Sequence, residues 1–432
     1  METKLPARAG AGPSTRLPSL TGLRFIAAML VFCFHITLSD SPIPPNDPIN
    51  LFADDSLAAN SAWLFSKAGY LGVSFFFVLS GFVLTWSSKP SDSLMSFWRR
   101  RMLKIFPNHL VMWVLAMVLF AAAITEPRSW LPNIFLLHSF FPQPETYVGV
   151  NPPSWTLCCE LLFYVLFPFL LRPVQRIRQS RLWFWAGVMV AGMVAVQLVT
   201  QFIIPDEPRS PITPVSVQQF WFGYIFPPSR LFEFVLGIVL ARIVISGRWL
   251  PISIGQAAGL SVVGYVVALF VPFLYGFNVA TIIPVAALIC AAAAADAAGR
   301  PTVLSTPRMQ WLGEISFGFY LCQGVVIFYG RQLIGAPDGF GTPMALLVTL
   351  GFFVATLIGG WLLYSRIEHP VMRRWSRPRR PAASTTPPVR PGPAGGAPLG
   401  EAALVVPAPA PVAPGGSSGE PVPSGVRHDP TT

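Results

Sequence analysis

Ten long apolar stretches, separated by short polar loops, fill most of this 432-residue chain and constrain its fold more than any other feature. They lie at residues 22–40, 68–86, 106–125, 155–171, 183–204, 231–247, 254–275, 280–298, 311–331 and 344–365. A helix needs about 20 such residues to cross the hydrocarbon core of a bilayer. Because lipid offers the backbone no hydrogen bonds, segments of this kind form helices. The sequence therefore predicts an all-α, polytopic membrane protein with about ten transmembrane helices.

The composition indicates that a lipid bilayer is the main partner of the chain. Only 11% of the residues are charged, whereas soluble domains carry about 25%. So few charges cannot solvate a globular surface. The net charge of +11 could indicate nucleic acid, but the basic residues form short clusters between apolar stretches rather than one compact basic domain. We therefore expect no nucleic-acid partner.

The basic clusters also predict the orientation of the chain. With a cytoplasmic N-terminus and alternating spans, the clusters at 99–104, 172–181 and 366–380 all face the cytoplasm, as the positive-inside rule requires. The opposite loops then hold five basic residues: Lys67, Arg128, Arg209, Arg230 and Arg331. A shorter stretch at 130–141, interrupted by Pro132, suits a re-entrant or interfacial segment. Both termini are expected in the cytoplasm, with the chain a multi-pass protein of the cytoplasmic membrane.

The chain divides into three parts by composition. Residues 1–19 are polar and form a short cytoplasmic N-terminal segment, and residues 20–375 form the transmembrane domain. Residues 376–432 are rich in Pro, Ala and Gly and cannot bury enough apolar surface to fold. We expect this last part to be a disordered cytoplasmic tail.

Arg24 and His35 lie in the first apolar stretch, where an ionisable residue is a functional candidate. They are 11 residues apart, which places them on one helical face and about 16 Å apart along the axis. A cation near the cytoplasmic end suits an anionic donor, and a neutral histidine deeper in the membrane can act as a general base. The alternative is that Arg24 extends to the headgroups and His35 is a packing residue; the periodicity leaves both open.

Three further charged residues are candidates for the same site. Glu160 is a carboxylate in an apolar stretch and needs a partner, which can be His35, Arg24 or another arginine. Arg101 and Lys104 share a helical face and can hold a phosphate-rich nucleotide. A cytoplasmic anchor for anionic lipid is the alternative for that pair.

Several kinds of chemistry lose support because their motifs are missing from the sequence. Residues 20–375 contain no GxSxG nucleophile motif, no Walker A loop and no HExxH motif. The five cysteines lie in apolar stretches without zinc-ligand spacing, so neither a disulfide framework nor a metal site is expected.

Motifs in a fixed order resemble the acyltransferase 3 family of bacterial membrane-bound O-acyltransferases. The segment 20–28 (LTGLRFIAA) with His35 downstream is similar to the family's opening motif. Segments 72–82 (GVSFFFVLSGF), 155–164 (WTLCCELLFY) and 312–321 (LGEISFGFYL) are similar to its later motifs. The opening looks most like actinobacterial members, which include macrolide O-acyltransferases.

The resemblance implies ten membrane helices and direct use of cytoplasmic acyl-CoA, with acetyl-CoA the expected donor and no permanently bound cofactor. In the family the histidine that matches His35 is regarded as catalytic. The matches to Arg24, Arg101 and Lys104 are implicated in activity and donor binding. Lys104 replaces an arginine, which keeps the charge but loses bidentate geometry. Gln323 stands where many members have a histidine.

These observations together predict a membrane-embedded O-acyltransferase. His35, oriented by Glu160, would deprotonate a hydroxyl of a glycan or of a secondary metabolite such as a macrolide; direct transfer and an acyl-histidine intermediate both stay open. A separate protein can handle the acceptor. The alternative is a transporter whose path is lined by the same buried charges. The internal repeats and matching broken helices expected of a transporter are not found in the sequence.

Overall fold

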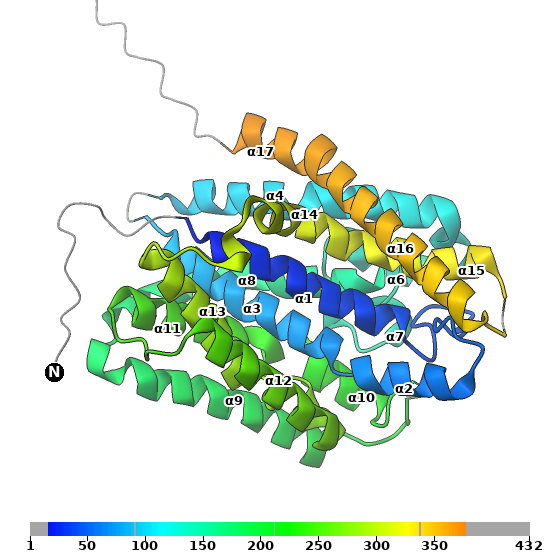
Figure 1. Cartoon of the computed structure of the whole chain (residues 1–432), viewed down its shortest axis with the longest axis horizontal. Coiled ribbons are helices and arrows are strands. Elements are labelled where there is room, and N and C mark those ends of the chain that lie inside the picture. Colours follow the sequence, from blue (N-terminus) through cyan, green and yellow to red (C-terminus); the bar gives the residue numbers. More distant parts are fainter. Residues whose placement is uncertain (1–15, 90–91, 211, 337, 377–432) are drawn as a thin grey trace, which may run out of the picture. The chain divides into compact units, whose positions relative to one another are not determined.

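The computed structural model describes residues 16–89, 92–210, 212–336 and 338–376. Within these ranges the regular secondary structure is helical, with isolated β-bridges but no strands, which confirms the predicted all-α class. Figure 1 shows long helices packed side by side. Nearly all of the expected N-terminal segment and tail lie outside the described residues.

A helix occupies each of the ten apolar stretches. These helices are α1 (Pro18–Ile36), α3 (Ala68–Trp86), α4 (Leu94–Ala116), α8 (Trp155–Arg176), α9 (Leu182–Phe202), α11 (Leu231–Ile245), α12 (Ile254–Phe270), α13 (Ile282–Ala297), α14 (Pro307–Gln323) and α16 (Thr342–Leu362). In the described part of the chain, seven helical segments are long and apolar enough to cross a membrane. They lie at 18–36, 55–86, 94–124, 152–176, 179–202, 307–334 and 342–375. Helices α11, α12 and α13 are shorter, with 15, 17 and 16 residues. Ten spans and cytoplasmic termini therefore stay predictions.

Several of the long segments are extended by further helical turns. The segment 55–86 begins with α2 (Asp55–Phe65). After α4 come η1 (Met117–Ala121) and α5 (Ala122–Ile124), and after α14 come η9 (Gly324–Tyr329) and α15 (Gly330–Ile334). The last segment continues from α16 through η10 (Leu363–Glu368) to α17 (His369–Trp375). The elements η1, η9 and η10 are π-helical, a geometry that is frequent at functional sites.

The stretch 130–141 folds as two short helices, α6 (Pro127–Ile134) and η2 (His138–Phe140), which are too short to span a bilayer. This agrees with its exclusion from the predicted spans, although Pro132 lies inside α6 and does not end it. The chain then passes through α7 (Pro144–Tyr147) and η3 (Pro152–Ser154) into α8.

Helices α3 and α11 touch through their backbones. A Cβ atom on Gly81 would collide with the carbonyl oxygen of Phe234, and a Cβ atom on Gly237 would collide with that of Val78. The contact fixes α11 in the interior, where the Arg230–Glu233 pair is fully buried with 2.8 Å between Nε and Oε2. This ion pair is the local pair that their spacing of three residues allows.

Helix α1 lies between α3 and α14, as Figure 1 shows. Its first turn is anchored by Asp296 at the end of α13, which accepts bonds from the backbone N–H of Ser19 at 2.9 Å and from the Ser19 hydroxyl at 2.6 Å. The carboxylate satisfies a donor that the helix itself leaves unpaired. This anchor fixes the end of α1 that carries Arg24.

Candidate active site

His35 lies one residue before the end of α1, and its ring is held by Gln323 from α14. His35 Nδ1 is 3.2 Å from Gln323 Oε1. An amide oxygen accepts hydrogen bonds only, so Nδ1 carries the proton of the neutral imidazole and Nε2 keeps a free lone pair. The ring of Phe328 contacts the imidazole edge to face, with 5.4 Å between centroids. His35 is therefore oriented as a base whose reactive nitrogen is Nε2.

The pairing of His35 with Glu160 that the sequence suggests is wrong. Gln323 occupies the position beside Nδ1, and Glu160 contacts the Tyr164 hydroxyl instead, at 3.2 Å from Oε2. Gln323 is fully buried at the point where α14 passes into the π-helix η9. Its signal in the sequence is an amide side chain within the apolar stretch 311–331.

A cavity of about 470 Å³ opens beside His35, and we call it the histidine cavity. Aromatic side chains form much of its wall: Tyr70, Tyr147, Trp155, Phe220, Tyr224 and Tyr320. Asp40 and Glu145 also line it, whereas no lysine or arginine among the described residues does. The lining therefore suits a neutral or cationic molecule with an apolar face and disfavours an anion.

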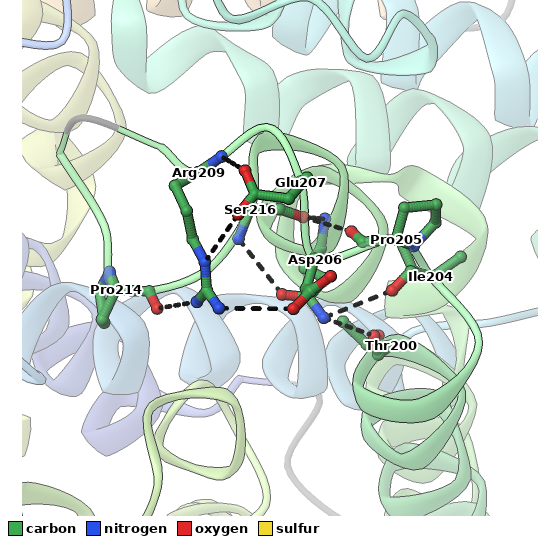
Figure 2. A network of polar contacts seen from close by, with 9 residues as sticks. Thr200, Ile204, Pro205, Asp206, Glu207, Arg209, Pro214 and Ser216 are labelled. Carbon is green, nitrogen blue, oxygen red and sulfur yellow. Dashed lines mark hydrogen bonds and ion pairs between the residues drawn. The ribbon is translucent and has the colours of Figure 1, made fainter.

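One wall of the histidine cavity comes from the loop between α9 and α10 (Val217–Phe220), through Ser210, Ile212 and Thr213. Figure 2 shows the polar contacts that hold this loop. The Arg209 guanidinium bonds to the carboxylate of Asp206 and to the backbone oxygen of Pro214, each at 3.4 Å. The loop thus holds its own shape at the edge of the cavity.

A second cavity of about 50 Å³ contains Arg24 and Glu160, and we call it the arginine cavity. Arg24 makes no hydrogen bond or ion pair to any described residue, but it is close enough to Glu160 for charge–charge attraction. The structure therefore supports Arg24, the other partner proposed for Glu160. The half-buried guanidinium of Arg24 remains available to an anionic ligand.

The other two predicted donor-binding residues lie next to the arginine cavity. The Arg101 guanidinium lies over the rings of Phe97 and Tyr164, at 5.5 and 5.7 Å from their centroids. Its Nε is buried without a hydrogen-bond partner among the described residues. Charge–charge attraction connects Glu160 with both Arg101 and Lys104. The structure thus brings the three predicted cations together around one carboxylate.

Glu368, which was not predicted as a site residue, completes this charged group. Glu368 is buried in η10, forms an ion pair with Lys104 and accepts a bond from Asn108 Nδ2 at 3.0 Å. A carboxylate in an apolar helix needs such a cation, and this need is the signal that could have found it. Lys104 is already paired, so a phosphate would share its ammonium group with Glu368.

His138 lies in the segment outside the predicted spans, and both of its ring nitrogens contact neighbouring side chains. Its Nε2 is 3.1 Å from the Ser154 hydroxyl, and its Nδ1 is 3.3 Å from Cys158 Sγ. Complete burial holds the pKa of His138 well below the ordinary value. The described residues contain no group of three or more His, Cys, Asp or Glu side chains placed to hold a metal ion.

The fold and this site define a helical membrane protein with a half-buried histidine beside a large cavity and a cationic group at a second one. The chain belongs to the acyltransferase 3 family, whose acyltransferase domain matches residues 17–365. This match confirms the resemblance seen in the motifs.

Three relatives illustrate the range of the family. The chain is 37% identical over 385 residues to the acyltransferase MdmB of Streptomyces mycarofaciens, covering 86% of this chain and 96% of that one. It is 26% identical to the exopolysaccharide production protein ExoZ of Rhizobium meliloti, covering 73% and 93%. It is 23% identical to the peptidoglycan O-acetyltransferase OatA of Listeria monocytogenes, covering 71% of this chain but only 48% of that protein. No solved structure matches the chain.

Proposed function

We propose that this protein is an O-acyltransferase that moves an acetyl or other short acyl group from cytoplasmic acyl-CoA to a hydroxyl of an acceptor in the histidine cavity. The observation that carries the proposal is the hydrogen bond from His35 Nδ1 to Gln323, which leaves Nε2 free as a base. Membership of an acyltransferase family supports it. O-acetyltransferases among the relatives support the choice of a hydroxyl as the acceptor group.

The charged group around the arginine cavity is proposed to bind the phosphates of the donor. Arg24 and Arg101 carry guanidinium groups without hydrogen-bond partners among the described residues, and arginine binds phosphate in a bidentate manner. Lys104 would join them with its ammonium group shared between the phosphate and Glu368. Glu160 would hold Arg24 in place by charge attraction rather than act on the acceptor.

The reaction follows from the position of His35. Nε2 takes the proton of the acceptor hydroxyl while the oxygen attacks the thioester carbonyl. The new C–O bond forms, the C–S bond breaks, and the proton passes to the leaving thiolate to give free CoA. A two-step route through acyl-His35 has the same balance.

The acceptor is proposed to be a hydroxyl-bearing glycan unit or a small metabolite such as a macrolide. Aromatic rings in the histidine cavity can pack against the apolar face of a sugar or lactone ring. The volume of about 470 Å³ limits the part of the acceptor that enters. A longer glycan would extend out of the cavity, with a separate protein presenting it.

The test is acyl transfer by purified protein supplied with acetyl-CoA and candidate acceptors. We expect His35→Ala to lose CoA release and acceptor acylation together. His369→Ala, on the exposed side of α17, is the matched control and should retain both. Full activity of His35→Ala would refute the role of His35. Acceptor movement across vesicles without any CoA release would favour the transporter alternative.

A further inference from the structure

The histidine cavity and the arginine cavity meet at two side chains. Among the described residues, Val73 on α3 and Tyr320 on α14 alone line both. On α14, Phe317 lines only the arginine cavity, three residues before Tyr320. On α3, Phe76 does so, three residues after Val73. The boundary is thus a single layer of side chains.

The boundary is closed in this structure. Tyr320 is buried, and its hydroxyl lies 3.0 Å from Thr156 Oγ1 and 3.2 Å from the carbonyl oxygen of Pro153. Its ring packs edge to face on Phe76, with 5.8 Å between centroids. The arginine cavity, with about 50 Å³, has room for only a few waters. A pantetheine arm therefore needs this boundary to open.

Of the two boundary residues, Tyr320 is the one whose side chain can move. Val73 follows Gly72, where a Cβ would come within 2.7 Å of the Ala27 carbonyl oxygen, so α3 is pressed against α1. Tyr320 lies on the last turn of α14 before the π-helix η9, and its hydroxyl is held by hydrogen bonds to Pro153 in η3 and Thr156 in α8. Breaking those two bonds frees the ring to rotate without moving a helix.

We infer that Tyr320 is a barrier residue between the two cavities. Its hydroxyl bonds hold the ring in place, and the ring keeps the thioester of the donor away from water in the histidine cavity. The inference rests on the proposed acyltransferase function. With the barrier absent, a water oxygen attacks the thioester carbonyl while His35 Nε2 takes its proton. The C–S bond breaks, and acetate and free CoA leave without acylation of an acceptor.

The experiment measures CoA release from acetyl-CoA by the purified full chain without acceptor. Thr156→Val removes one hydrogen bond from the Tyr320 hydroxyl, and we expect release to rise roughly fivefold. Tyr320→Ala removes the whole barrier and should raise release further. Tyr329→Phe is the matched control. It removes a buried hydroxyl that bonds to the Val150 carbonyl oxygen at 2.6 Å, and Tyr329 lines neither cavity.

Two further measurements separate the barrier from the proposed function. Release by Tyr320→Ala should return to background when His35→Ala is added, because the water then lacks its base. If calorimetry shows that wild type and Tyr320→Ala bind acetyl-CoA but release CoA equally slowly, the barrier is refuted and the acyltransferase proposal stands. If neither protein binds acetyl-CoA, the proposed function fails and the barrier with it.

Discussion

Replacing Gln323 with leucine tests the most specific feature of the site. The substitution keeps a side chain of similar size but removes the acceptor that lies 3.2 Å from His35 Nδ1. Leaving a buried donor unpaired costs about 1–3 kcal/mol, and each 1.4 kcal/mol is about tenfold in rate. Because the imidazole can then turn toward other partners, fewer molecules hold Nε2 in the reactive orientation. We expect kcat to fall roughly 5- to 150-fold.

The KM for acetyl-CoA should stay unchanged in Gln323→Leu, because Arg24, proposed to bind the donor, lines the other cavity. The assay is steady-state CoA release in the presence of acceptor, with thermal unfolding as a check of folding. Gln332→Leu is the matched control, since its amide bonds to the Pro44 carbonyl at the surface. Gln323→His should retain much of the activity, because its ring nitrogen can accept the same bond. Wild-type kcat in a folded Gln323→Leu protein would refute the orienting role.

Two other predictions concern donor binding and packing. Arg24→Gln should raise the KM for acetyl-CoA roughly tenfold through the loss of a charge-assisted contact. The control Arg100→Gln, at an exposed ion pair, should leave the KM unchanged. Equal KM values for the two variants in steady-state kinetics would contradict donor binding by Arg24. Gly237→Ala should lower the thermal midpoint in detergent, because the new Cβ collides with the Val78 carbonyl oxygen and overpacking costs about 1–3 kcal/mol. Gly259→Ala, with no atom near its Cβ, should not lower it.

The positions of the helices could be predicted because apolar backbone must satisfy its own hydrogen bonds, but their lengths could not. The stretch 254–275 reads as one span by hydropathy, yet α12 ends at Phe270 because Pro272 disfavours the helical conformation at the residue before it. In the stretch 231–247, helix α11 already ends at Ile245, just before Gly247, whose φ of 69° belongs to a turn. Conversely, α4 begins at Leu94 because the Ser93 side chain caps it.

The parts of the site that lie on one helix could be predicted from the sequence. The contacts between residues of different helices could not. Arg24 and His35 follow from the periodicity of α1 alone. The choice between Glu160 and Gln323 as the partner of His35 depends on how α14 packs on α1, and charge alone favours the carboxylate. Glu368 was missed for the same reason, since its partner Lys104 lies 264 residues earlier in the chain.

Within the proposed function, the distance between Arg24 and His35 explains why the site has two cavities. CoA carries its phosphates and its thioester at opposite ends of a flexible arm, so cations and base must be separated by part of that arm's length. A single rigid helix sets this separation at 1.5 Å per residue and keeps both side chains on one face. One residue inserted between them would rotate His35 by about 100°, away from Gln323 and out of the histidine cavity. The rigidity of α1, anchored at Ser19 and pressed against α3 at Gly72, is therefore part of how the site would align donor and base.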